Sequence, residues 1–311
     1  MSKKILVSAN PHIRSEATIE KIMYDVVIAL LPACIAGVYF FGIRALITIV
    51  LSVTACVSAE WLFEKIAKKP ITIRDGSAVV TGLLLAMNLP YTVPFWLPVV
   101  GGFFAIIIVK MLFGGLGHNF MNPALAARAF LLTSYPVQMT TWSIDATSGA
   151  TPLGRMEEGG FIPASIDYFN ALFGFNGGSL GEVCTIAIIL GGIYLIVRGV
   201  ISWRTPVSFI AAFFLLASII KRPGFDASYP LYELLTGGLM LGAFFMATDY
   251  ASAPIHPKGQ FIMGIGCGVL AILIRFYGGY PEGVCYSILI MNLVVPYIDK
   301  ITVPHVYGGG K

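Results

Sequence analysis

A polar stretch between two long apolar regions carries the residues best placed for chemistry. Segment 145–153 reads DATSGATPL and offers three hydroxyl groups and one carboxylate. Gly149 and Ala150 leave the backbone before Thr151 uncluttered, so another enzyme could lay this loop against its own active site. Loops rich in Ser, Thr and Gly are also common wherever a chain turns, so the string alone is equally compatible with an ordinary turn.

The segment resembles the acceptor sequence for covalent flavin attachment. In proteins with this motif, a dedicated flavin transferase moves the FMN half of FAD onto a threonine hydroxyl and leaves a phosphoester bond. The resemblance implies that the acceptor is Thr151. The other motif positions fall on Asp145, Ser148, Gly149 and Ala150. Arg155 is expected to pair with the phosphate or the ribityl chain, although a solvated loop charge explains it equally well.

The composition is that of an integral membrane protein. Of the 311 residues, 57% are hydrophobic and 12% are charged, and the mean hydropathy is +0.83. Soluble domains carry about twice that share of charge. The net charge of +4 is spread along loops, which indicates membrane topology rather than nucleic-acid binding. Segment 1–21 is polar and the first apolar run is long enough to remain in the bilayer, so no cleavable signal peptide is expected.

Hydropathy predicts about ten transmembrane helices. The expected spans are 22–41, 45–63, 76–89, 95–113, 120–135, 181–198, 206–220, 235–248, 260–277 and 283–298. The spans 76–89 and 235–248 are short for a full crossing and end in turn signals, so we expect broken helices there. The resulting parts are a cytoplasmic segment (1–21), a first membrane repeat (22–135), an external loop (136–180), a second membrane repeat (181–298) and a cytoplasmic tail (299–311).

Most Lys and Arg residues fall in alternate loops, which sets the expected orientation. With both termini in the cytoplasm, that side receives the majority of the cations. The loop that carries Thr151 then lies outside the plasma membrane of a bacterium or archaeon. This is the side on which flavin transferases of the resembled proteins work.

Two glycine-rich segments share one layout. In 101–115 and 264–279, glycines precede an apolar run, a cation (Lys110 or Arg275) and an aromatic-Gly-Gly turn. With five spans in each half, the second copy would be inverted, and breaks in such repeats usually mark ligand sites. The sequence therefore predicts an all-α membrane protein with two inverted five-helix repeats. Coincidence among glycine-rich helices is the alternative.

Segment 114–124 (GGLGHNFMNPA), the motif at Thr151 and the span pattern together resemble the RnfD family over nearly the whole chain. RnfD proteins belong to Rnf ferredoxin:NAD oxidoreductases, and a close relative is the B subunit of sodium-pumping NADH:quinone oxidoreductases. The short N-terminal extension and the Thr-Pro-Leu ending favour the Rnf type. The resemblance implies an electron-transfer subunit with covalent FMN, in a complex that couples ferredoxin:NAD chemistry to Na⁺ or H⁺ movement.

No complete active site is expected in this chain. Its five cysteines show no CxxC spacing and its four histidines no zinc-type spacing, so no metal site is predicted. No Walker loop or dinucleotide fingerprint is present, so NAD and ferredoxin should bind partner Rnf-type subunits. The other expected partners are the flavin transferase and membrane lipid. A quinone-reductase-type subunit is the nearest alternative function; a solute channel also fits the fold but has no use for the motif.

The quinone-reducing relative holds a non-covalent riboflavin, so the resemblance also implies a second flavin. Asn119 and Asn122 are spaced for one helical face, and the topology brings them to the cytoplasmic side with Asp249 from the other half. Amides and a carboxylate suit the donor and acceptor edges of an isoalloxazine ring. Helix capping is the alternative, with Asn119 as N-cap and Pro123 in the first turn. A matching outer site, near the attached flavin, would use Asn88 and Glu282.

Ionisable residues inside or at the edge of the bilayer cost roughly 3 kcal/mol each at a helix centre, so they should have partners or purposes. They are Asp25, Glu60, Lys110, Arg128, Asp249, Arg275 and Glu282. We expect Lys110 and Arg275 to lie at the interface with their stems snorkelling. Arg128 lies half a span deep and Asp249 ends a broken helix, so these two need partners.

Overall fold

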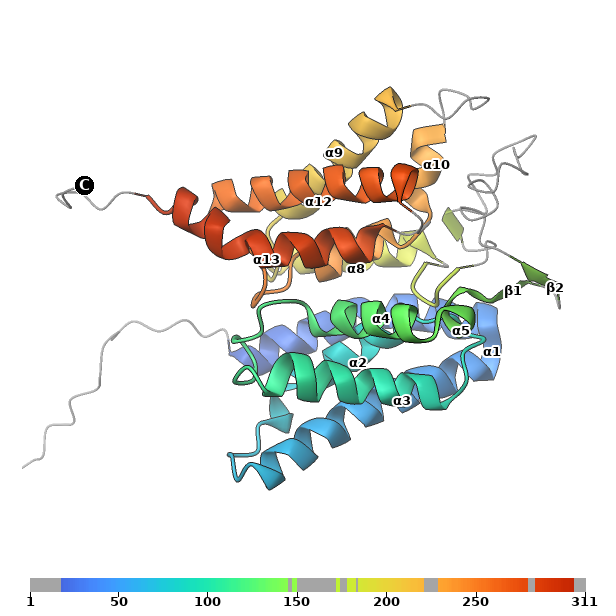
Figure 1. The fold of residues 1–311 in the computed structure, drawn as a ribbon, viewed down its shortest axis with the longest axis vertical. Helices are drawn as coiled ribbons and strands as arrows, with labels where there is room; N and C mark the ends of the chain where they lie inside the picture. The colour runs from blue at the N-terminus through green and yellow to red at the C-terminus, as the bar shows by residue number, and fades with distance from the viewer. Residues whose placement is uncertain are drawn as a thin grey trace, which may run out of the picture.

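The structure is a computed structural model that describes residues 18–144, 147–149, 172–173, 178–182, 184–220, 229–278 and 283–304. The chain is predominantly helical, and Figure 1 shows its helices in two groups, one from each half of the sequence. Among the described residues the only sheet is a hairpin of two short strands, β1 (Trp142–Ile144) and β2 (Thr147–Gly149). The prediction of a helical chain is therefore confirmed, with this hairpin as an addition.

The first helix, α1 (Ile19–Ile66), contains two of the expected spans. At 48 residues it would be about 72 Å long if straight, more than twice the bilayer core of about 30 Å. Gly42, with φ of +69°, breaks it near the middle, and Figure 1 shows the second half turning back beside the first. Thr18 caps the helix by accepting a hydrogen bond from the Lys21 N–H at 3.3 Å.

The rest of the first half is made of short helices. They are the 3-10 helix η1 (Ile73–Asp75), α2 (Ser77–Met87), α3 (Trp96–Phe103), the π-helix η2 (Phe104–Met111), α4 (Pro123–Ser134) and α5 (Pro136–Thr140). Because α2 has 11 residues, it is about 16 Å long and covers only half of a bilayer. The expected short helix at 76–89 is therefore present.

The second half contains longer helices around one interrupted segment. Its elements are α8 (Thr185–Val197), α9 (Arg204–Ile219), α10 (Tyr229–Leu235), α11 (Leu239–Leu241), the π-helix η3 (Gly242–Met246), α12 (Pro257–Tyr277) and α13 (Val284–Thr302). Gly237 and Gly238 have φ of +72° and +66° and separate α10 from α11, so the expected break within 235–248 is present. Among the described residues α1, α12 and α13 are long and apolar enough to cross a membrane.

The two halves meet where the first half of α1 packs against α8. Asp25, near the start of α1, accepts hydrogen bonds from Tyr194 and Arg198 at the end of α8. Gly191 lies against the Ala29 carbonyl near the middle of the contact. Because early residues of one helix meet late residues of the other, the two helices are antiparallel. The larger of two apolar core clusters extends across both halves, and the smaller one lies in the first half.

Segment 178–182, which precedes α8, binds the end of α2. The Gly181 N–H donates to the Met87 carbonyl at 2.7 Å, and the Leu180 N–H donates to the Leu89 carbonyl at 3.1 Å. The last carbonyls of a helix have no partners within the helix. Segment 178–182 supplies two partners where α2 stops.

Candidate functional site

The flavinylation motif is described only in part. Ser148 and Gly149 belong to β2, whose backbone pairs with β1 in the register Ser143 to Ser148 and Trp142 to Gly149. The other residues predicted for this site and its surroundings lie outside the described residues: Asp145, Ala150, Thr151, Arg155 and Glu282. Figure 1 shows the hairpin at the end of the molecule opposite to the C-terminal end of α13.

A polar cluster lies where α4 begins. Asn122 is the N-cap of α4: its Oδ1 accepts hydrogen bonds from the N–H groups of Ala124 (3.0 Å) and Leu125 (3.3 Å), and Pro123 occupies the first turn. The predicted cap was Asn119, which is wrong; the residue directly before the proline takes this role. Neither asparagine lies within the helix, so the expected shared helical face is absent as well.

The other half of the chain reaches the same cluster through the turn after η3. Asp249 accepts a hydrogen bond from the Ser252 hydroxyl at 2.9 Å. The Asn119 side chain, whose Nδ2 donates to the Met121 carbonyl at 3.1 Å, lies near this carboxylate, so the structure brings Asn119 and Asp249 close together from opposite halves. Burial raises the pKa of the Asp249 carboxyl, and its polar neighbours Ser252, Ala251 and Asn119 partly oppose that rise.

Asn292 on α13 joins this cluster and was missed in the sequence. In the amide orientation that gives both its nitrogen and its oxygen a partner, Asn292 donates a hydrogen bond to the Ser252 carbonyl at 3.2 Å and accepts one from the Asn122 N–H at 3.1 Å. The Asn122 side chain also donates to the Met246 carbonyl at 3.4 Å. An asparagine within an otherwise apolar span was the available signal, since a buried amide needs partners.

Asn88, predicted for an outer site, lies at the end of α2 beside Met246. Its Nδ2 donates to the Leu84 carbonyl at 2.6 Å and is 3.7 Å from the Met246 Sδ. Its Oδ1 accepts a hydrogen bond from Arg128 at 2.6 Å. The expected partner for Arg128 is therefore present. Since Asn122 also contacts Met246, Asn88 adjoins the cluster at the start of α4.

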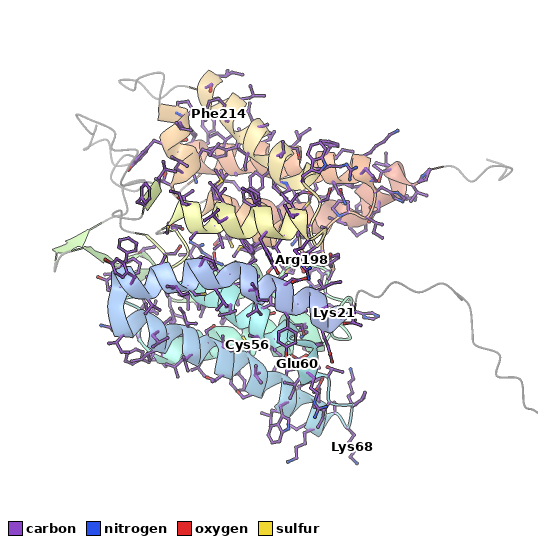
Figure 2. The ribbon with its side chains drawn as sticks, turned by 180° about the vertical axis from the view of Figure 1, so that it is seen from behind. Lys21, Cys56, Glu60, Lys68, Arg198 and Phe214 are labelled. Carbon is purple, nitrogen blue, oxygen red and sulfur yellow. The ribbon has the colours of Figure 1, made fainter. Side chains whose placement is uncertain are left out.

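Lys110 and Glu60 form a buried ion pair. The Lys110 Nζ is 2.8 Å from the Glu60 Oε1 and 2.6 Å from the Ser77 Oγ, and the two charged side chains are 2% and 1% exposed. Figure 2 labels Glu60 on the second half of α1. The predicted snorkelling of Lys110 is wrong, because this face of η2 packs against α1 and α2.

Arg275 is also buried, at 1% exposure, so its predicted snorkelling is wrong. It donates to the Glu233 carbonyl at 2.7 Å and to the carbonyls of Thr236 and Gly237 at 3.5 Å, and it lies over the Phe213 ring at 4.9 Å. The break after α10 leaves these carbonyls without helical partners. A cation is favourable at the negative end of a helix dipole, which accounts for the inward position.

Metal ligation finds no support in the part of the chain that the structure describes. No group of three or more His, Cys, Asp or Glu side chains lies close enough there to hold an ion. All five cysteines are free, and four of them are buried. The polar groups described above are amides, carboxylates and cations, which suit an organic ligand with hydrogen-bonding edges.

Comparison with known proteins identifies the family. A model described as the NQR2, RnfD, RnfE family matches residues 6–308. The chain is 48% identical over 313 residues to the D subunit of the Na(+)-translocating ferredoxin:NAD(+) oxidoreductase complex of Acetobacterium woodii, an alignment that covers 99% of this chain and 96% of the relative. It is 45% identical over 316 residues to the D subunit of the proton-translocating ferredoxin:NAD(+) oxidoreductase complex of Clostridium ljungdahlii, covering 97% and 96%. Identity to the D subunit of the ion-translocating oxidoreductase complex of Aliivibrio salmonicida is 36% over 349 residues, covering 98% and 99%. The chain belongs to the NQR2, RnfD, RnfE family.

Proposed function

We propose that this chain is the membrane electron-transfer D subunit of an ion-translocating ferredoxin:NAD oxidoreductase complex and carries FMN on Thr151. The observation that carries the proposal is the motif at 145–153 in a chain that matches two such D subunits almost end to end. The FMN supplies one- and two-electron chemistry when bound. The Thr151 Oγ1 forms the phosphoester, and the transferase releases AMP from FAD.

The proposed membrane arrangement has ten spans in two inverted repeats, with both termini cytoplasmic and the flavin loop external. Three features support it. Gly76 before α2 and Gly238 before α11 both have left-handed φ angles, +76° and +66°. Lys110 binds beside the first of these glycines, at Ser77, and Arg275 binds beside the second, at the Gly237 carbonyl. The first helices of the two halves pack antiparallel.

The attachment test uses the intact complex on a denaturing gel. Wild type should show one flavin-fluorescent band under ultraviolet light at the mass of this chain, and the peptide with residue 151 should carry the mass of FMN. Thr151→Ala should abolish both signals. Thr147→Ala is the matched control, because it removes a hydroxyl from the same loop outside the motif positions, and it should retain both signals. Retention in Thr151→Ala would overturn the assignment.

We also propose a non-covalent riboflavin at Asn119, Asn122 and Asp249. These residues offer amide and carboxylate groups from both halves, which fits the alternating donors and acceptors of an isoalloxazine edge. The Met121 carbonyl orients the Asn119 amide and the Ser252 hydroxyl orients the Asp249 carboxylate, so both groups are held by their neighbours.

The riboflavin test must separate binding from the capping role of Asn122. Asn122→Ser keeps an oxygen for the α4 cap but removes the amide hydrogens. Asp249→Asn removes the charge while keeping the size. The complex is denatured, and flavin released from the protein is measured; both variants should release less riboflavin than wild type, and Thr133→Val, on the exposed end of α4, should release as much. Full release from folded Asn122→Ser and Asp249→Asn, or none from wild type, would refute the site.

The chain is proposed to work only with partner subunits that bind ferredoxin and NAD. Its described residues are almost wholly helices of the membrane bundle, and no dinucleotide fingerprint is present in the sequence. Purified alone, it should be reducible by a strong donor but inactive with ferredoxin and NAD together. Full activity of the isolated chain would contradict this division of work.

A further inference from the structure

The turn that follows the second half of α1 is densely basic. It spans residues 65–74, which we call the basic turn, and its cations Lys65, Lys68, Lys69 and Arg74 are all exposed. Figure 2 shows Lys68 on the projecting end of α1, away from the rest of the bundle. The ion pairs of Lys110 with Glu60 and of Arg198 with Asp25 do not involve these four cations.

The backbone of the basic turn is held by a buried acid. Glu64, at 1% exposure, accepts hydrogen bonds from the Thr72 N–H at 3.1 and 3.2 Å and from the Thr72 hydroxyl at 2.5 Å. The Lys69 N–H donates to the Glu64 carbonyl at 2.9 Å, and Lys68 adopts a left-handed φ of +53°. The Glu64 carboxylate is thus buried, whereas the four cations are exposed on a turn that its hydrogen bonds hold. A site held in this way loses little conformational entropy when it binds a ligand.

Apolar side chains lie among these cations. Ile66 and Ile71 are 73% and 63% exposed, and Trp61, one turn before, is 42% exposed with the Lys65 Nζ 4.7 Å from its ring. Alternation of Trp, Ile and Lys matches the boundary between acyl chains and headgroups, where indoles and lysine stems lie with one end apolar and the other wet. An acidic protein surface would leave the two isoleucines against polar groups.

We propose that the basic turn is a docking site for the phosphate headgroups of anionic phospholipids in the cytoplasmic leaflet. The cations bind the phosphates, while Trp61, Ile66 and Ile71 lie against the upper acyl chains. Each juxtamembrane cation strengthens binding to an anionic surface about fivefold, so loss of two should weaken it about 30-fold.

The test measures lipid retention by the whole complex in detergent, using native mass spectrometry with phosphatidylglycerol, phosphatidylcholine or inorganic phosphate added. Lys68→Gln/Lys69→Gln removes two charges from the basic turn. Lys258→Gln/Lys300→Gln is the matched control, because it removes two exposed charges proposed for the same side of the membrane. We expect preferential retention of phosphatidylglycerol by wild type and the control, and loss of that preference in Lys68→Gln/Lys69→Gln at low salt.

Three outcomes would overturn the proposal. Equal loss in both double variants would mean that total charge, not this turn, attracts the lipid. Displacement of phosphatidylglycerol by millimolar inorganic phosphate would indicate a simple anion site. Unchanged lipid retention with release of another subunit from Lys68→Gln/Lys69→Gln would indicate that the turn binds an acidic protein surface instead.

Discussion

Lys110→Met should strongly destabilise the protein, because it leaves the Glu60 carboxylate buried without its counter-charge. The Glu60 Oε1 accepts its hydrogen bond from Lys110, and Oε2 has no hydrogen-bond partner among the described residues. Removing one partner of a buried ion pair costs about 3–5 kcal/mol, whereas replacing both partners by neutral groups is often close to neutral. The double variant Glu60→Gln/Lys110→Met should therefore be more stable than Lys110→Met alone.

The pair of Asp25 and Arg198 provides the internal reference. Arg198 lies with its side chain 55% exposed and its NH2 group 3.2 Å from the Asp25 Oδ2, so solvent screens this interaction. Exposed pairs contribute about 0–1 kcal/mol. The coupling energy between Glu60 and Lys110 in a double-mutant cycle should accordingly exceed about 3 kcal/mol, and that between Asp25 and Arg198 should stay below about 1 kcal/mol.

The assay is equilibrium unfolding of the purified chain in mixed micelles. Unfolding is monitored by steric trapping, so that the free energy of unfolding is measured under native conditions. All variants are compared at one pH and one salt concentration, because screening acts on the exposed pair more than on the buried one. A loss below about 1 kcal/mol for Lys110→Met would refute the reasoning. So would a double variant whose loss equals the sum of the two single losses.

Three further predictions concern the cap, the helix contacts and the pH dependence. Asn122→Ala removes the oxygen that accepts two backbone hydrogen bonds and should lower the free energy of unfolding by about 1 kcal/mol, with Asn122→Ser retaining most of it. Gly82→Ala should cost about 1–3 kcal/mol in the same assay, because its Cβ would lie 2.7 Å from the Val53 Cα across the contact of α2 and α1. Burial raises the pKa of Asp249 in the folded state. The contribution of Asp249 to the free energy of unfolding is therefore fully present below its unfolded-state pKa of about 3.9 and is lost as the pH rises through its folded-state pKa. Asp249→Asn should remove this loss in a titration of unfolding free energy, and an unchanged pH profile would contradict the assignment.

Hydropathy predicted the positions of most helices, because each of them contains a long apolar run. It separated α1 into its two halves, because the expected boundary between residues 41 and 45 contains the break at Gly42. It also predicted the short α2 and a broken helix within 235–248, because both segments are short and end in turn signals. The hairpin was missed, since three-residue strands carry too little alternation to be recognised.

Side-chain direction was the main source of error. Position along a span gives depth, so Lys110 and Arg275 were expected at the interface; their burial depends on which face of the helix meets α1, α9 or a broken backbone. The N-cap of α4 is Asn122 rather than Asn119, because the fixed φ of Pro123 suits the first position of a helix and the residue directly before it then becomes the cap. The proximity of Asn119 and Asp249 could be predicted, because the charges in the loops set the orientation of the two halves and place both residues on one side.

The hairpin of β1 and β2 would limit the movement of the flavin that we propose on Thr151. Thr151 follows the last residue of β2, Gly149, by two residues, and two residues of extended chain reach at most about 7 Å. On the other side, the chain from Thr151 to the anchored segment 178–182 is more than ten times longer. The proposed cofactor is therefore on a short tether at one end only. Its electron-transfer distance to a partner is set by the position of the hairpin, and lengthening the chain between Gly149 and Thr151 should slow electron transfer more than lengthening it after Thr151.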